Sequence, residues 1–115
     1  MPFPEYEDMD DPLLCFILLN GGRDHEVSAG STYEPLADFF RLTKHERNDP
    51  RPDGRSEPEW HNRVQWARQR PINHGYLDGS RDGFWRLTAA GLQRAERVVS
   101  KYETLKRWVP KPLPS

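Results

Sequence analysis

The alternation of apolar and polar positions divides the chain into predicted helices and one small hairpin. The longest apolar run, Leu13 to Leu19, follows Asp11 and Pro12 and precedes Gly21 and Gly22. An aspartate before a proline is typical of a helix start, and glycine is typical of a helix end. Periodicity does not separate helix from strand in so apolar a run, but these end signals favour a buried helix starting at Asp11.

Shorter elements are predicted over the next 35 or so residues of the chain. His25 to Val27 suit a short strand, and residues 31–40 suit a helix whose contacts are made by Leu36, Phe39 and Phe40. Thr43, followed three residues later by Glu46, has the spacing of a capping box that opens a helical turn. Residues 48–55 contain two prolines and a glycine and are predicted to form a loop.

The following helix, 56–70, has two distinct faces. Ser56 and Glu59 have the spacing of a capping box at its start. Steps of 100° per residue place apolar side chains on one face, which we expect in the core: Trp60, Val64, Ala67 and Pro71. The opposite face carries Asn62, Gln65 and Gln69, with Trp66 beside them. Because proline removes a helical hydrogen bond, we expect the helix to end or bend near Arg70.

A hairpin follows directly, with strands predicted near Tyr76 to Asp78 and Phe84 to Leu87 around the turn 79–83. A helix followed by a small basic hairpin is the layout of a winged helix, whose helix enters the major groove of DNA. The sequence therefore predicts an α+β winged helix-turn-helix fold. It would be mostly helical, with a small antiparallel wing hairpin and a long C-terminal helix.

That C-terminal helix is predicted to be capped by Thr88 and to run to about Val109. A narrow apolar seam recurs along it at spacings of three and four, and comprises Ala95, Val98, Tyr102, Leu105 and Val109. Such a seam packs on the first helix or pairs with a second copy of the chain, and the sequence leaves both open. Residues 110–115 are proline-rich and predict a tail or linker. At 115 residues, the chain is expected to form one domain over 1–109.

Charge is unevenly distributed along the chain. The net charge of -1 argues against nucleic-acid binding, but residues 1–50 hold 4 Lys and Arg against 11 Asp and Glu, whereas residues 51–107 hold 12 against 7. A basic half can meet phosphates while an acidic half faces away. An unevenly charged, solvated surface with no partner is the alternative.

Candidate DNA contacts come from the helix 56–70 and the hairpin. Asn and Gln can pair with the adenine edge, Arg pairs with guanine or phosphate, and Ser can bond a phosphate. Trp66 either packs beneath the wing or presents an apolar surface to a base methyl group. The predicted contacts are Asn62, Arg63, Gln65, Trp66, Arg68, Gln69 and Arg70 on the helix, with Ser80, Arg81 and Arg86 in the hairpin.

Catalysis finds little support in the sequence. The four histidines are scattered, no metal-ligand spacing is present, and no glycine-rich phosphate loop occurs, so we expect no enzyme activity, metal or cofactor. No run approaches the ~20 apolar residues of a membrane span. The single cysteine, Cys15, cannot form an internal disulfide, and it lies in an apolar run. A reducing, cytoplasmic location is expected.

These residues resemble the N-terminal winged-helix domain of Mrr-type restriction proteins. The strongest part of the resemblance is an ordered set of positions, supported by weaker similarity at 42–47 and from Phe3 to Leu14. The set comprises Asn62, Arg63, Val64, Trp66, Ala67 and Arg68, then Gly75 and Leu77, then Gly83, Trp85, Arg86, Leu87, Thr88 and Gly91. Pro71 and Ile72 depart from the family, which usually has a continuous helix there.

The resemblance implies a double-stranded DNA-binding module joined to a nuclease domain or subunit that cuts modified foreign DNA. Related winged helices recognise adenine methylated at N6, and by position Trp66 would contact the methyl group. No nuclease domain is present in the chain, so it is expected to be either an excised sensor domain or a free-standing binder. The alternatives are a protein-interaction module that dimerises through the C-terminal seam and a plain winged-helix transcriptional regulator.

Overall fold

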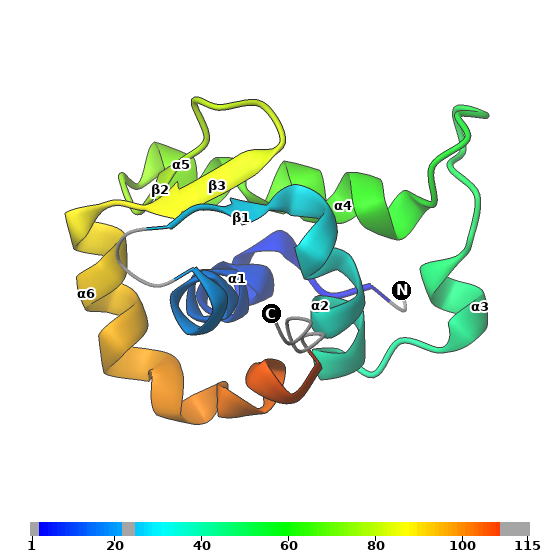
Figure 1. The fold of residues 1–115 in the computed structure, drawn as a ribbon. Helices are drawn as coiled ribbons and strands as arrows, with labels where there is room; N and C mark the ends of the chain where they lie inside the picture. The colour runs from blue at the N-terminus through cyan, green and yellow to red at the C-terminus, as the bar shows by residue number, and fades with distance from the viewer. Residues whose placement is uncertain (1–2, 22–24, 109–115) are drawn as a thin grey trace, which may run out of the picture.

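A computed structural model describes residues 3–21 and 25–108 of the chain, and Figure 1 shows helices wrapped around a central helix. The proline-rich tail predicted at 110–115, the seam position Val109 and the predicted helix stop at Gly22 lie outside the described residues. In chain order the elements are α1 (Tyr6–Asn20), β1 (Val27–Ser28), the 3₁₀ turn η1 (Ala29–Thr32), α2 (Tyr33–Phe39), α3 (Lys44–Arg47), α4 (Glu59–Ala67), α5 (Gln69–Asn73), β2 (Leu77–Asp78), β3 (Phe84–Leu87), α6 (Ala89–Val98), and the 3₁₀ turns η2 (Val99–Lys101) and η3 (Glu103–Trp108).

The central helix is α1, which supplies most of the core. It begins at Tyr6 rather than at Asp11, so the prediction that Asp11 caps it is wrong. Acidic residues in the first turn suit the positive end of a helix, and Pro12 is accommodated inside it on the buried side. Asp11 instead accepts two hydrogen bonds from Arg94 of α6, at 2.9 and 2.7 Å. No helix in the described part of the chain has the length and apolar character needed to span a membrane.

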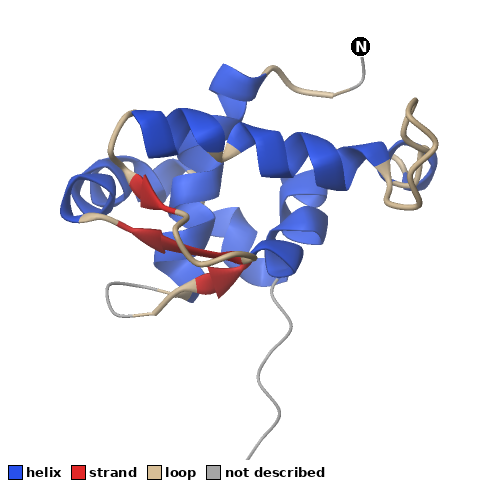
Figure 2. Cartoon of the chain, turned by 90° about the horizontal axis from the view of Figure 1, so that it is seen from above, coloured by secondary structure: helices blue, strands red, loops and turns tan. Residues whose placement is uncertain are grey.

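The three short strands form an antiparallel sheet in the order β1-β3-β2 (Figure 2). Val27 lies opposite Trp85 across β1 and β3, and Leu77 lies opposite Leu87 across β2 and β3. The predicted strands are confirmed, although each of β1 and β2 is only two residues long. Helix, strand, helices, hairpin and helix follow one another in winged-helix order, so the fold prediction is confirmed.

The segment between β1 and α4 also follows its prediction. The helix expected at 31–40 is divided between η1 and α2. Thr43 and Glu46 form the predicted capping box, in which each side chain bonds the backbone N–H of the other residue, at 3.1 and 2.7 Å. The prolines at 50 and 52 lie in the predicted loop, which leads into α4.

Helix α4 begins later than predicted, at Glu59, and Ser56 does not cap it. The N-cap is Pro58, and a residue before a proline is disfavoured in helical conformation, which stops the helix from extending back to Ser56. The predicted interruption near Arg70 occurs at Arg68, where α4 gives way to α5. The predicted core face is confirmed, because Trp60, Val64, Ala67 and Pro71 are all fully buried.

The C-terminal helix starts as predicted, with the Thr88 hydroxyl accepting the Gly91 N–H at 3.0 Å. It is shorter than predicted: α6 ends at Val98 and the chain continues in 3₁₀ turns. Ala95 and Leu105 of the seam are fully buried, and both α6 and η3 pack on α1. Of the two arrangements left open by the sequence, the seam therefore adopts the intramolecular one.

Candidate nucleic-acid interface

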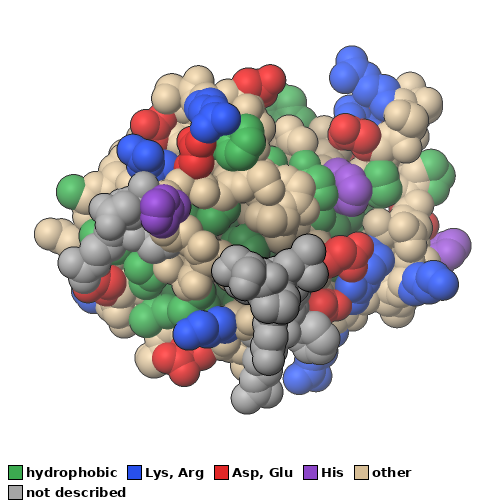
Figure 3. All heavy atoms as spheres, in the orientation of Figure 1, with side chains coloured by type: hydrophobic (Ala, Val, Ile, Leu, Met, Phe, Trp, Pro, Cys, Tyr) green, Lys and Arg blue, Asp and Glu red, His purple; other side chains and the backbone are tan. Residues whose placement is uncertain are grey.

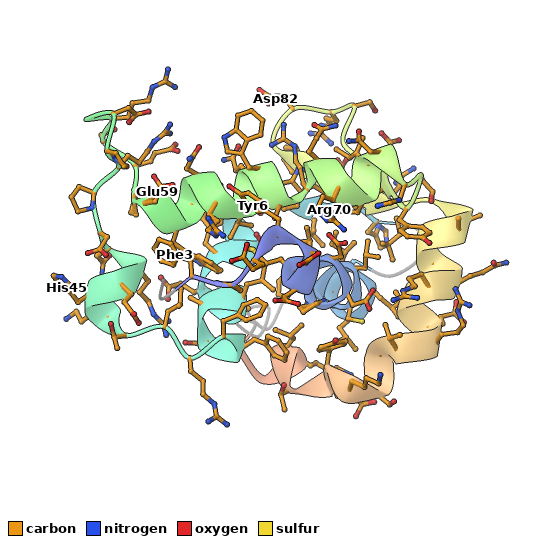
Figure 4. The ribbon with its side chains drawn as sticks, turned by 180° about the vertical axis from the view of Figure 1, so that it is seen from behind. Phe3, Tyr6, His45, Glu59, Arg70 and Asp82 are labelled. Carbon is orange, nitrogen blue, oxygen red and sulfur yellow. The ribbon has the colours of Figure 1, made fainter. Side chains whose placement is uncertain are left out.

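A groove of about 480 Å³ runs along the outer face of α4. It is formed by α4, the start of α5 and the loop that precedes α4. Five predicted site residues come together in it, and the loop adds three more residues. The lining comprises Asn62, Gln65, Trp66, Arg68 and Gln69, with Arg51, Arg55 and Glu57 from the loop. Figure 4 shows the side chains that project from α4 between Glu59 and the start of α5.

The three amide side chains of the groove are each held by a neighbour. Asn62 donates to the Glu59 carboxylate at 3.3 Å, and Gln69 donates to the Asn73 side chain at 2.8 Å. Gln65 donates from Nε2 to the hydroxyl of Tyr33 on α2 at 2.6 Å. These bonds limit the rotamers of the amides, so their remaining polar atoms are presented to the groove in restricted orientations.

Trp66 is 62% exposed, so it does not pack beneath the wing, and that alternative is wrong. No other large hydrophobic side chain within residues 3–21 and 25–106 is as open to solvent. Arg68, one turn along the chain from Gln65, is half-buried and donates to the Gln65 carbonyl oxygen at 2.7 Å. The groove therefore combines an exposed aromatic surface, amide groups and a guanidinium group on one helix face.

The loop supplies basic residues that sequence reasoning missed. Arg51 and Arg55 both flank Asp53, with the Arg51 Nη2 at 2.7 Å and the Arg55 Nε at 3.7 Å from Oδ2 of that carboxylate. Basic side chains gather at the upper right of Figure 3, where this loop lies in Figure 1. The sequence did contain a signal for this basic loop, because two arginines stand shortly before the predicted recognition helix.

Two predicted helix contacts lie outside the groove. The guanidinium group of Arg63 donates from Nε and Nη2 to the carbonyl oxygen of Pro4, at 2.9 and 2.7 Å, and lies 4.4 Å from the Tyr6 ring centre. Arg70 pairs with Asp10 of α1 at 3.1 Å. Both arginines thus hold the N-terminal segment against α4 and α5.

The predicted wing residues lie around a second, smaller hollow of about 180 Å³, which Ser80, Arg81 and Arg86 line together with Phe84 and the acidic residues Glu26 and Asp78. Arg81 forms an ion pair with Glu26 and lies 4.0 Å from the centre of the Phe84 ring. The Ser80 backbone N–H donates to Asp78 at 2.9 Å. This bond, the Ser80 side chain and the charge of Arg86 hold the pKa of Asp78 below its ordinary value.

Residues 9–97 match the family model of the Mrr N-terminal domain. The chain belongs to the Mrr N-terminal domain family. Searches of curated proteins and of solved structures found no match to this chain. The family is associated with restriction systems. The matched region contains the whole groove and the wing.

Burial shifts the pKa values of two titratable side chains of this Mrr N-terminal domain, His61 and Cys15. Within residues 3–21 and 25–108, no group of three or more His, Cys, Asp or Glu side chains could hold a metal ion. Burial lowers the pKa of His61, whose ring stacks on Tyr33 at 4.1 Å. Burial also raises the pKa of the Cys15 thiol to about 12. The side chains that line the groove can form hydrogen bonds, cationic contacts and apolar contacts with a ligand.

Proposed function

We propose that this domain binds double-stranded DNA, with α4 in the major groove. The observation that carries the proposal is the groove on the protein surface along α4, which is lined by Asn62, Gln65 and Gln69 with Arg68 and an exposed Trp66. Family membership supports it, because a restriction-system module acts in a context of DNA cleavage. The wing contacts the DNA backbone through Arg81, Ser80 and Arg86.

Recognition of bases follows from the chemistry of the groove. An amide group can form paired hydrogen bonds with N6 and N7 of adenine, and each good pair contributes about 1–3 kcal/mol of discrimination. Asn62, Gln65 and Gln69 carry such groups, and Arg68 lies beside them. Arg63 and Arg70 support the interface from behind, since their guanidinium groups are bonded to Pro4 and Asp10.

Reading of N6-methyladenine is the finer part of the proposal. A large aromatic side chain in water is unfavourable, and 62% exposure of Trp66 favours a partner that covers it. A methyl group at adenine N6 projects into the major groove beside the atoms that amides bond. The domain then directs a nuclease, supplied by another domain or subunit, to modified DNA.

The assignment of the groove is tested with two matched glutamines. Gln69 lines the groove, whereas Gln93 is exposed on α6, away from α4. Gln69→Ala is expected to weaken binding to a preferred duplex by roughly tenfold, as removal of a base contact does. Gln93→Ala is expected to bind as the wild type does. Equal affinity of the two variants and the wild type would contradict the assignment of the groove as the DNA-binding surface.

A further inference from the structure

The loop 50–58 is a closed structure that projects beside the start of α4 (Figures 1 and 2). Its ends are joined by an isolated β-bridge between Pro50 and Pro58, and the Glu59 N–H donates to the Asp49 carbonyl oxygen at 2.8 Å. At its tip, Gly54 has a φ of 78°, which favours glycine. Because its ends are tied, the loop holds its side chains in a defined position relative to α4.

Asp53 organises the two arginines of this loop. Its carboxylate accepts a hydrogen bond from Arg51 Nη2 at 2.7 Å and from the Arg55 backbone N–H at 3.0 Å. The Arg55 N–H, followed by the charge of Arg51, holds the pKa of Asp53 below its ordinary value. Asp53 is therefore ionised at neutral pH and keeps both guanidinium groups at the groove.

The protein leaves these guanidinium groups incompletely satisfied. Arg51 is only 14% exposed, and its Nε is buried without a hydrogen-bond acceptor among the described residues. Arg55 is 75% exposed, and its guanidinium group lies 3.7 Å from Asp53, too far for a good hydrogen bond. Both arginines therefore retain N–H donors that Asp53 does not bond.

We infer that loop 50–58 is a second DNA-contacting arm, in which Arg51 and Arg55 bind a backbone phosphate next to the bases that α4 reads. The inference rests on the proposed function. Guanidinium groups match phosphate oxygens in geometry and in charge. The loop lies at the N-terminal end of α4, and the wing lies toward its other end, so the two arms bracket the recognition helix (Figure 4).

The test uses three variants that each remove one positive charge. R51Q and R55Q alter the arm, and R97Q alters an exposed arginine on α6, away from α4. Each is titrated with one duplex, methylated and unmethylated, over a series of salt concentrations. Thermal unfolding is measured in parallel, and R55Q is the decisive variant because the exposed Arg55 side chain contributes little to folding.

R51Q and R55Q are each expected to weaken binding about tenfold for both duplexes and to leave their affinity ratio unchanged. The salt slope should fall by about one for each phosphate that the variant no longer neutralises. R97Q should match the wild type. If R55Q keeps the wild-type affinity and salt slope while Gln69→Ala weakens binding, the role of the loop in DNA binding is contradicted. The proposed function is retained in that case. A wild-type protein that binds no duplex would overturn both.

A parallel measurement uses free inorganic phosphate, because it carries the same kind of oxygen acceptors as the DNA backbone. Inorganic phosphate alone is expected to give no saturable thermal shift that depends on Arg55. A saturable shift abolished by R55Q, with duplex affinity unchanged in that variant, would assign the loop to a small anion and overturn its role in DNA binding.

Discussion

Gln65 on α4 donates a hydrogen bond to the hydroxyl of Tyr33 on α2 across 2.6 Å. The Tyr33 carbonyl oxygen also accepts the Trp60 indole N–H at 2.7 Å, and the Tyr33 ring stacks on His61. Tyr33 thus contacts successive turns of the recognition helix. Its backbone and ring position α4, while its hydroxyl orients the Gln65 amide, which lines the groove.

Tyr33→Phe separates these two roles, because it removes only the hydroxyl. Loss of a hydrogen bond of about 0.5–1.5 kcal/mol should reduce the preference for the favoured base about two- to tenfold. Affinity for unrelated duplex should not change. Competition binding measures both quantities, and in a Gln65→Ala background the same change should have no effect on preference. Unchanged preference in Tyr33→Phe would show that the hydroxyl does not position Gln65 for readout.

Trp66→Ala is expected to lower the preference for adenine-methylated over unmethylated duplex about fourfold, the equivalent of about 0.8 kcal/mol for one buried methyl-sized group. Thermal stability should change little, since the side chain is 62% exposed. Paired titrations of the two duplexes measure the ratio. Discrimination that survives in the folded variant contradicts the methyl contact.

Arg63→Ala is expected to act on stability rather than on recognition. It removes two hydrogen bonds to the Pro4 carbonyl oxygen and the contact with the Tyr6 ring. A loss of about 1–2 kcal/mol in the free energy of unfolding should result. Urea denaturation measures the loss, and the affinity ratio between duplexes should stay at the wild-type value. Altered base preference with unchanged stability would place Arg63 in the interface.

Gly91→Ala tests the close approach of α6 to the hairpin. A Cβ at Gly91 would lie 1.9 Å from the Tyr76 carbonyl oxygen, so backbone must move. Alanine gains about 1 kcal/mol over glycine within a helix, but overpacking costs about 1–3 kcal/mol or more, and we expect net destabilisation. Gly30→Ala is the control, because a Cβ there meets no atom within 4 Å. A Gly91→Ala protein as stable as wild type would contradict this packing.

Cys15 predicts a loss of stability at alkaline pH. Burial raises its pKa from 9.0 to about 12, so the folded state binds the thiol proton more tightly than the unfolded state. The stabilisation is complete below about pH 9 and is lost as the pH rises from about 9 toward 12. Comparing wild type with Cys15→Ala by denaturation at several pH values isolates this contribution. Parallel stability curves for the two proteins over that pH range would contradict the burial of the thiol.

Local signals predicted much of the fold. Thr43 and Thr88 cap helices as expected because a cap depends on residues within one turn. Ser56 and Asp11 have similar signals, but Pro58 and an earlier helix start override them. The Pro58 effect was itself readable, since proline disfavours a helical residue before it.

The groove was predictable only in part. Helical spacing places Asn62 and Gln65 on one face, because that relation follows from geometry within α4 alone. Gln69 lines the groove with them although it begins α5. The contacts of Arg63 with Pro4 and of Gln65 with Tyr33 join segments far apart in the chain, and no local pattern encodes them. The arrival of Arg51 at the groove depends likewise on how the loop closes.

The most direct test of DNA binding and methyl reading is a titration of the wild-type domain against one duplex. The duplex is prepared unmethylated, adenine-methylated and cytosine-methylated, and each form is measured at about 50 and 200 mM salt. We expect binding that weakens steeply with salt and is tightest for the adenine-methylated form. Equal, salt-sensitive binding to all three forms would contradict methyl reading and leave a general DNA-binding domain. Absence of binding to any form at the lower salt concentration would contradict the proposed function as a whole.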